Sequence, residues 1–169
     1  SGAQTTDMPA TIVTGSSRGI GRGIALRFAD DGYDVAINYH TNEEAAEAVA
    51  ESVRDRGQSA VVVGADVSDP DAATRLVESA VDAFGGLAHV VNNAGIAGPT
   101  KPIQEITLEE WQRVQDVNVT GTFLCTKHAV RHLVESDRAS IVSISSRSAK
   151  TPHPNRTPYT ASNAGQLTM

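Results

Sequence analysis

The sequence of 169 residues has a single cysteine, no long apolar run and fewer basic than acidic residues. Its one cysteine, Cys125, has no partner for an internal disulfide, which favours a reducing compartment. No stretch reaches the ~20 apolar residues of a membrane-spanning helix, and the polar N-terminus lacks the apolar segment of a signal peptide. These absences predict a cytoplasmic protein without a membrane partner.

The charge balance argues against a second class of partner. Fourteen Lys and Arg residues stand against 20 Asp and Glu residues, which gives a formal net charge of −6. Phosphate backbones attract basic surfaces, so we expect no nucleic-acid partner. We expect no metal either: His128 and His132 lie one helical turn apart, but no third ligand or Glu-bearing zinc motif accompanies them. This pair is interpreted as part of a helix surface.

Short β-branched runs alternate with amphipathic segments along the chain. Strands are predicted near residues 10–13, 35–39, 60–64, 87–91 and 141–145. Helices are predicted over residues 19–31, from 41–44 to 57, over 68–84, from 107–110 onward, over 119–135 and from about 159. This alternation implies a parallel sheet with right-handed crossovers, hence a doubly wound α/β fold of the Rossmann type. Residues 8–169 are predicted to form one dinucleotide-binding domain, preceded by a tag remnant or disordered start over residues 1–7.

Helix caps and apolar faces give more detailed expectations. Thr41-Asn42-Glu43-Glu44 matches a capping box. Ser68-Asp69-Pro70-Asp71 is typical of a helix start, and Thr107-Leu108-Glu109-Glu110 is expected to cap a further helix. Trp111 is interpreted as a helix packing residue. The residues expected on inward helix faces are Ile20, Ile24, Ala25 and Phe28 in the first helix, and Phe123, Leu124, Val130 and Leu133 in the long one.

A glycine-rich turn follows the first predicted strand. It reads Thr14-Gly15-Ser16-Ser17-Arg18-Gly19-Ile20-Gly21 and opens a helix. Such a turn lets backbone N–H groups approach a pyrophosphate, and the helix N-terminus adds partial positive charge. A tight turn without a ligand is the alternative. The order of strand, turn, helix and second strand favours dinucleotide binding.

Polar residues also follow the other predicted strands. They are Asp66-Val67 after the third strand, Asn92-Asn93-Ala94-Gly95 after the fourth, and Ser145-Ser146, with Pro158-Tyr159 further on, after the fifth. Doubly wound sheets bind ligands outside the carboxyl ends of their strands, so this edge is the predicted site. Taken singly, Asp66 can equally begin a helix, and the two asparagines can equally form a turn.

With these motifs, the chain resembles the short-chain dehydrogenases/reductases from about Met8 to its last residue. The matching residues are Thr14, Gly15, Gly19 and Gly21 of the turn, Asn92 to Gly95, Asn118 between two valines, Ser146, and Tyr159 thirteen residues later. The resemblance is greatest to 3-oxoacyl carrier-protein reductases and to the related sugar or polyol dehydrogenases. It implies an oxidoreductase that interconverts a small carbonyl compound and its alcohol, and a homo-oligomer for the complete chain.

The resemblance also assigns roles to individual residues. Tyr159 would be the general acid/base for the carbonyl oxygen, Ser146 would hydrogen-bond that oxygen, and Asn118 would hold a proton-relay water. Asp66, followed by Val67, would meet the adenine. The remaining implied cofactor contacts are Gly15, Ser17, Arg18, Gly19, Ile20 and Gly21 in the turn, and the backbone of residues 92–95, including Asn92, Ala94 and Gly95, beside the ribose.

The chain departs from the family pattern at Asn163. The family has Tyr-x-x-x-Lys, whereas Tyr159 is followed four residues later by asparagine. A positive charge at ~4 Å in an effective dielectric of ~20 contributes about 4 kcal/mol. Neutral Asn163 supplies no such charge, so the tyrosinate would lose its main stabiliser. We expect cofactor binding to survive and chemistry to be slowed.

The chain also stops at Met169, inside the helix that begins near Tyr159. Family members continue with more strands and a substrate-covering segment, so we expect this chain to be part of a longer product. The resemblance implies a dimer face on the two helices after Asn118 and Tyr159, with association weakened by the early stop. The departures keep open a non-catalytic nucleotide-binding or interaction protein.

Cofactor choice is predicted from the second strand. An acidic residue at its end would bind the ribose 2′-hydroxyl of NAD and repel a 2′-phosphate. Asn38 is assigned to that position, followed by Tyr39 and His40, and Arg18 lies in the glycine turn. A missing carboxylate and an added cation favour NADP(H) over NAD(H). Alternatively, Arg18 is simply a solvated turn residue.

Overall fold

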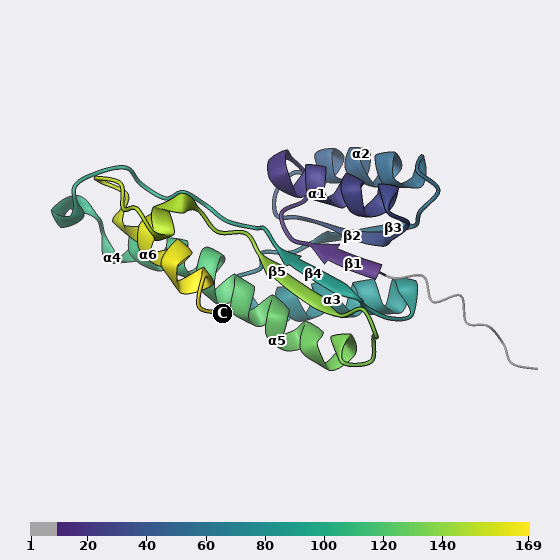
Figure 1. The fold of residues 1–169 in the computed structure, drawn as a ribbon. Helices are drawn as coiled ribbons and strands as arrows, with labels where there is room; N and C mark the ends of the chain where they lie inside the picture. The colour runs from purple at the N-terminus through teal and green to yellow at the C-terminus, as the bar shows by residue number, and fades with distance from the viewer. Residues whose placement is uncertain (1–9) are drawn as a thin grey trace, which may run out of the picture.

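The computed structural model describes residues 10–169, so the expectation for residues 1–7 and the start at Met8 lie outside the described residues. Five parallel strands form one sheet in the order β3-β2-β1-β4-β5 (Figure 1). Their bounds are β1 Ala10–Val13, β2 Asp34–Tyr39, β3 Ala60–Gly64, β4 His89–Asn92 and β5 Ser140–Ser143. The predicted doubly wound α/β fold is therefore confirmed.

Helices cover both faces of the sheet. They are α1 Gly19–Asp30, α2 Glu43–Arg54, α3 Pro70–Phe84, α4 Leu108–Gln115, α5 Gly121–Leu133 and α6 Thr157–Gln166. In Figure 1, α1 and α2 lie on one face and α3 and α5 on the other. The pair α4 and α6 pack together beyond the carboxyl ends of the strands. A π-helical turn, Asp116–Thr120, joins α4 to α5.

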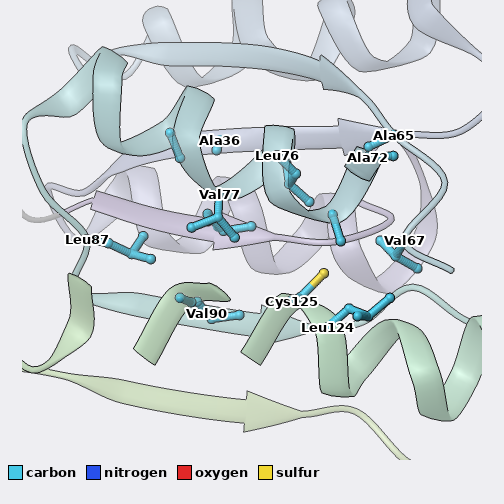
Figure 2. Packing of buried hydrophobic residues seen from close by; sticks show 14 of the residues in the cluster. Ala36, Ala65, Val67, Ala72, Leu76, Val77, Leu87, Val90, Leu124 and Cys125 are labelled. Carbon is cyan, nitrogen blue, oxygen red and sulfur yellow. The ribbon is translucent and has the colours of Figure 1, made fainter. Parts of the chain in front are cut away.

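The strands are buried on both sides, as expected of a parallel sheet. Successive side chains point to opposite faces, so Ile12 packs toward α3 and α5 while Val13 packs toward α1 and α2. Figure 2 shows the first of these clusters, where Leu76 and Val77 of α3 meet Leu124 and Cys125 of α5. Burial raises the pKa of the Cys125 thiol to about 12, so the thiol stays protonated and unreactive.

Two predicted helix starts are confirmed in atomic detail. The Asp69 carboxylate accepts a hydrogen bond from the Ala72 amide at 2.7 Å, and Pro70 occupies the first turn of α3. At α4, Thr107 and Glu110 form the reciprocal capping box.

The predicted box at Thr41 is wrong by one residue. Asn42 caps α2 instead, and its Oδ1 accepts from the Ala45 amide at 2.9 Å. Thr41 and Asn42 are both good capping residues, and spacing to the following glutamate favoured the first. The asparagine side chain is the one that reaches the third helical N–H.

Three residues predicted to face inward are exposed instead: Ile20 at 68%, Phe123 at 51% and Val130 at 41%. The buried face of α1 consists of the small residues Gly21, Ala25 and Ala29, which let the helix approach the sheet closely. In α5 the core takes the face that includes Leu124, Cys125, Ala129 and Leu133. Both helices carry apolar residues on two sides, so periodicity could not select the buried one.

The histidine pair on α5 also differs from expectation. His128 Nε2 lies 3.2 Å from Thr74 Oγ1, and His132 Nε2 lies 3.2 Å from Glu78 Oε1. Both partners belong to α3, so the histidines are half-buried at a helix contact and not on a free surface. Within residues 10–169, no group of three metal-ligating side chains forms a metal site. The described helices are also too short or too polar to cross a membrane.

Candidate cofactor and catalytic site

A cavity of about 450 Å³ opens at the carboxyl ends of β1, β2, β3 and β4. The glycine turn forms one wall, the loop after β4 another, and α4 reaches it from beyond the sheet. The predicted cofactor residues that line it are Gly15, Ser17, Arg18, Gly19, Ile20, Asn38, Tyr39, His40, Asp66, Val67, Ala94 and Gly95. Its position is the expected ligand-binding edge of a doubly wound sheet.

The glycine turn has the backbone geometry that its sequence requires. Gly15 and Gly19 have φ angles of +62° and +56°, where a side chain is disfavoured. Gly21 does not line the cavity. A Cβ there would lie 2.5 Å from the Gly15 carbonyl oxygen and would also clash with the Asn93 amide. Glycine at position 21 therefore allows the close packing of α1 under the turn.

The N-terminus of α1 faces this turn without a side-chain cap. Arg18 is the cap residue, and its side chain makes no capping hydrogen bond. The first N–H groups of a helix have no partner within the helix and carry partial positive charge. This end of α1 can therefore bind an anionic group of a ligand.

Hydrogen bonds from Asn93 join the turn to the end of β4. Asn93 Nδ2 donates to the carbonyl oxygens of Thr14 and Gly15, at 3.0 and 3.2 Å. Thr14 Oγ1 accepts from the amides of Asn93 and Ala94, each at 2.9 Å. The turn is thus held in place before any ligand binds.

Asn92, by contrast, faces away from the cavity. It is 2% exposed, and its Nδ2 donates to Thr126 Oγ1 of α5 at 3.0 Å. The expectation for the ribose concerned the backbone of residues 92–95, so this orientation of the Asn92 side chain does not test it. Successive residues point to opposite sides of a strand, so Asn93 takes the cavity side and Asn92 the α5 side.

Asn38 lines the cavity, but its side chain is engaged by backbone groups. Its Oδ1 accepts from the Gly15 amide at 3.0 Å, and its Nδ2 donates to the carbonyl oxygens of Val63 and Ala65 at 3.2 and 3.1 Å. The side chain is buried and committed to backbone groups. It therefore braces β1, β2 and β3 at the cavity floor, and Tyr39 and His40 are the residues that face the opening from this strand end.

Asp66 takes part in a cluster of polar contacts at the cavity wall. Its Oδ1 accepts from the Ser68 amide at 3.0 Å and from Ser68 Oγ at 2.6 Å. Its Oδ2 accepts from Arg113 at 3.0 Å and lies 3.6 Å from His40 Nε2. Burial alone would raise the pKa of Asp66, but the hydrogen bonds from Ser68 and Arg113 outweigh it and lower the pKa. The carboxylate is thus ionised at neutral pH.

Asn118 lies in the π-helical turn and is buried. Its Oδ1 accepts from the Ile96 amide at 2.8 Å, and its Nδ2 donates to the Ile96 carbonyl at 2.9 Å and to Ser162 Oγ at 2.9 Å. Both amide hydrogens are in use. The Asn118 side chain therefore joins the loop after β4 to α6.

Tyr159 lies in the first turn of α6, and two side chains hold its backbone. Its carbonyl oxygen accepts from Ser162 Oγ and from Asn163 Nδ2, each at 2.9 Å. Its ring is half-buried, and the Arg156 guanidinium carbon lies 5.6 Å from the ring centroid. Asn163 itself is buried and turned onto its own helix.

The end of β5 contacts the same helix. Ser145 Oγ donates to the Asn163 carbonyl at 2.9 Å. Ser146 Oγ accepts from the Ser148 amide at 3.1 Å, which starts a short turn. The structure thus brings Asn118, Ser145 and Asn163 together around α6, whereas Ser146, Tyr159 and Asn163 do not line the 450 Å³ cavity.

The cavity lining also includes residues that were not predicted as site residues, among them Arg113 and Ile96. Arg113 lies on a helix that the sequence predicts, but nothing in the sequence indicates that this helix points back to β3. Ile96 contributes backbone groups as well as surface, and backbone groups carry no sequence signal. Only the tertiary arrangement reveals either residue.

Comparison with known proteins places this geometry in a family. The chain matches the family model described as short chain dehydrogenase over residues 9–169. Glucose 1-dehydrogenase 2 of Bacillus subtilis is 41% identical over 155 residues, which are 91% of this chain and 60% of the relative. A 3-oxoacyl-acyl-carrier-protein reductase of Staphylococcus aureus is 36% identical over 94% of this chain and 64% of its own length. The chain thus spans less than two thirds of the length of these curated relatives.

Solved structures agree with the fold. A short chain dehydrogenase from Burkholderia cenocepacia in complex with NADP has a TM-score of 0.91 and 37% identity, over 96% of this chain and 65% of that chain. An NAD⁺-bound xylitol dehydrogenase has a TM-score of 0.89 and 31% identity, over 98% and 63% of the two chains. The resemblance seen in the sequence is confirmed, and these neighbours include both forms of the nicotinamide cofactor.

Proposed function

Because the chain belongs to the short-chain dehydrogenase family, we propose that it carries the NADP(H)-binding part of an oxidoreductase for a ketone or 3-oxoacyl group. The carrying observation is the cavity built from the glycine turn, the uncapped start of α1 and Asp66. The proposal extends to a small-molecule substrate, a cytoplasmic location, a homo-oligomer of the complete protein, and one domain over residues 8–169.

The residues present fit a dinucleotide. Gly15 and Gly19 line the cavity with positive φ angles and no side chain, so backbone N–H groups of the turn are accessible to a pyrophosphate. The N-terminus of α1 favours negative charge at the same place. When bound, the nicotinamide supplies or accepts a hydride.

The choice of NADP(H) over NAD(H) rests on the residues at the cavity opening. Asp66 is the one carboxylate among the described cavity-lining residues, and Arg113 is already paired with it. Arg18 has no ion-pair partner within residues 10–169 and is available to a 2′-phosphate. With Asn38 buried, Tyr39 and His40 are the end-of-strand residues beside that phosphate.

For the chemistry, Tyr159 would donate the proton to the substrate oxygen and Ser146 would hydrogen-bond it. Asn163 holds the Tyr159 carbonyl and brings no charge to the phenol. We therefore expect slow turnover. The same contact supports the alternative of a non-catalytic nucleotide-binding protein, in which α6 keeps only its structural role.

The test combines binding with turnover. NADPH and NADH are titrated into the protein by nicotinamide fluorescence, and absorbance is followed with a panel of 3-oxoacyl thioesters, ketones and sugars. We expect NADPH to bind more tightly than NADH, and Arg18→Ala to narrow the difference. Equal or reversed preference in the unmodified protein would contradict the cofactor assignment. Binding without turnover on any carbonyl would favour the non-catalytic alternative.

A further inference from the structure

Arg113 reaches from α4 to the loop that follows β3. Its Nη2 lies 3.0 Å from Asp66 Oδ2, and its Nη1 donates to Ser68 Oγ at 3.0 Å. The planar guanidinium thus contacts two neighbouring acceptors at once, a geometry that a lysine cannot reproduce. The contact joins two elements that are 47 residues apart in the chain.

The surroundings of Asp66 explain why this contact matters for a ligand. Ser68 supplies two donors to Oδ1, whereas Arg113 is the one charged donor within hydrogen-bond distance of Oδ2. Without Arg113, only the two Ser68 donors at Oδ1 would hold the carboxylate, so the direction of Oδ2 would be less fixed.

We propose that Arg113 is a positioning residue for the purine end of the dinucleotide. It fixes Asp66 so that the remaining lone pair of Oδ2 accepts from the exocyclic amino group of adenine. This inference rests on the proposed function, because it requires a dinucleotide in this cavity.

The proposal separates the tasks of the two arginines. Arg18 is at the turn, where a 2′-phosphate distinguishes NADPH from NADH. Arg113 acts through Asp66 on the adenine, which both cofactors share. Loss of Arg113 should therefore weaken NADPH and NADH to the same degree, whereas loss of Arg18 should weaken NADPH alone.

The experiment measures dissociation constants of NADPH, NADH and the hypoxanthine analogue of NADPH, in which a carbonyl replaces the amino group. The variants are Arg113→Met, Arg113→Lys, Asp66→Ala and the Arg113→Met/Asp66→Ala double variant. Arg75→Met is the matched control, since Arg75 is exposed on α3 and has no ion pair among the described residues. Thermal midpoints of all variants report on folding.

We expect Arg113→Met to weaken both adenine cofactors roughly tenfold, the effect of one charge-assisted hydrogen bond. The preference for adenine over hypoxanthine should fall several-fold, and Arg113→Lys should restore only part of it. The double variant should bind no more weakly than Asp66→Ala, because Arg113 acts through that carboxylate. A general loss of structure would lower the thermal midpoint and leave the base preference unchanged.

Each negative result contradicts a different part of the proposal. If Arg113→Met binds all three nucleotides as Arg75→Met does, Arg113 has no positioning role, and the proposed function stands. Additive losses of nucleotide affinity in the double variant would likewise contradict the proposal that Arg113 acts through Asp66. If the unmodified protein binds neither NADPH nor NADH, the proposed function and this inference fall together.

Discussion

Asn163 is the residue where the site departs most from its family, and the structure gives it a definite task. It is buried, and its side chain satisfies the Tyr159 carbonyl while Ser145 holds its own backbone. An asparagine that is fully used in this way stabilises α6. It delivers no charge to the tyrosine. Asparagine at position 163 therefore serves the stability of α6, whereas a positively charged side chain there would stabilise the tyrosinate.

Asn163→Lys should therefore change turnover far more than nucleotide affinity. General acid–base catalysis contributes a rate factor of ~10² to 10⁴, so we expect a large gain in kcat. The alkaline limb of alcohol oxidation should move to lower pH, because the ammonium stabilises the tyrosinate. NADPH affinity should stay within about tenfold, the worth of one hydrogen bond. Steady-state kinetics across pH measure both effects.

Asn163→Gln is the control for this substitution, since it lengthens the side chain without adding charge. It should leave kcat close to that of the unmodified protein. If the asparagine form already turns over as fast as the lysine form, another group must supply the charge. In that case the interpretation of a slowed site is wrong.

His89 predicts a pH dependence of stability. It is buried beside the rings of Tyr33 and Phe28, its Nδ1 lies 2.7 Å from Ser140 Oγ, and its Nε2 has no hydrogen-bond partner among the described residues. Burial, and secondarily the positive charge of Arg138, lowers the pKa of His89. Below its ordinary value of ~6.5 the unfolded chain binds the proton more readily than the folded one.

The free energy of unfolding should thus be at its full value above pH ~6.5 and decrease as pH falls toward the lowered pKa. Urea unfolding at pH values from about 5 to about 8, on both sides of ~6.5, measures how the free energy of unfolding changes with pH. His89→Gln should flatten this slope, whereas His153→Gln, in an exposed loop, should not. An unchanged slope in the His89 variant would assign the pH dependence to other groups.

At the scale of elements, the sequence predicted what local chemistry decides. The caps of α3 and α4 and the glycine turn need only neighbours in the chain, and the structure has them in place. The inward faces of α1 and α5 depend on how closely each helix approaches the sheet, which is a tertiary property. The hydrogen bonds of Asn38 could not be predicted for the same reason: its partners come from the glycine turn, from β3 and from the residue that follows β3.

The turn and α1 offer a matched pair of substitutions. Gly21→Ala places a methyl group against the Gly15 carbonyl and Asn93, so we expect the turn to shift and NADPH binding to be lost. Gly23→Ala, two residues along the same helix, meets no atom within 4 Å. It should leave binding intact and raise stability by up to about 1 kcal/mol. Fluorescence titration and thermal unfolding of both variants provide the comparison, and equal binding by the two would refute the clash.

For the whole molecule, the prediction concerns association of the chain with a second copy of itself. The exposed Phe123 and Val130 lie seven residues apart on α5 and form an apolar outer stripe. By family resemblance, this helix and α6 would meet a second copy. We predict weak, concentration-dependent association, and Phe123→Glu should abolish it, because a charge would be buried. Sedimentation velocity over a range of concentrations is the measurement, and a tight dimer through these helices would contradict the prediction.

The strand order also has a consequence for the timing of synthesis. β1, near the start of the chain, is the central strand, with β2 and β3 on one side and β4 and β5 on the other. The first half of the sheet is complete at Gly64, whereas β4 ends at Asn92, 28 residues later. At a ribosomal rate of ~5–20 residues per second, the open edge of β1 waits roughly 1 to 6 seconds for its partner. During that interval α1 and α2 already shield one face of the half-sheet. The other face, which α3 and α5 cover in the complete fold, and the open edge of β1 are the parts accessible to a chaperone or a nascent neighbour.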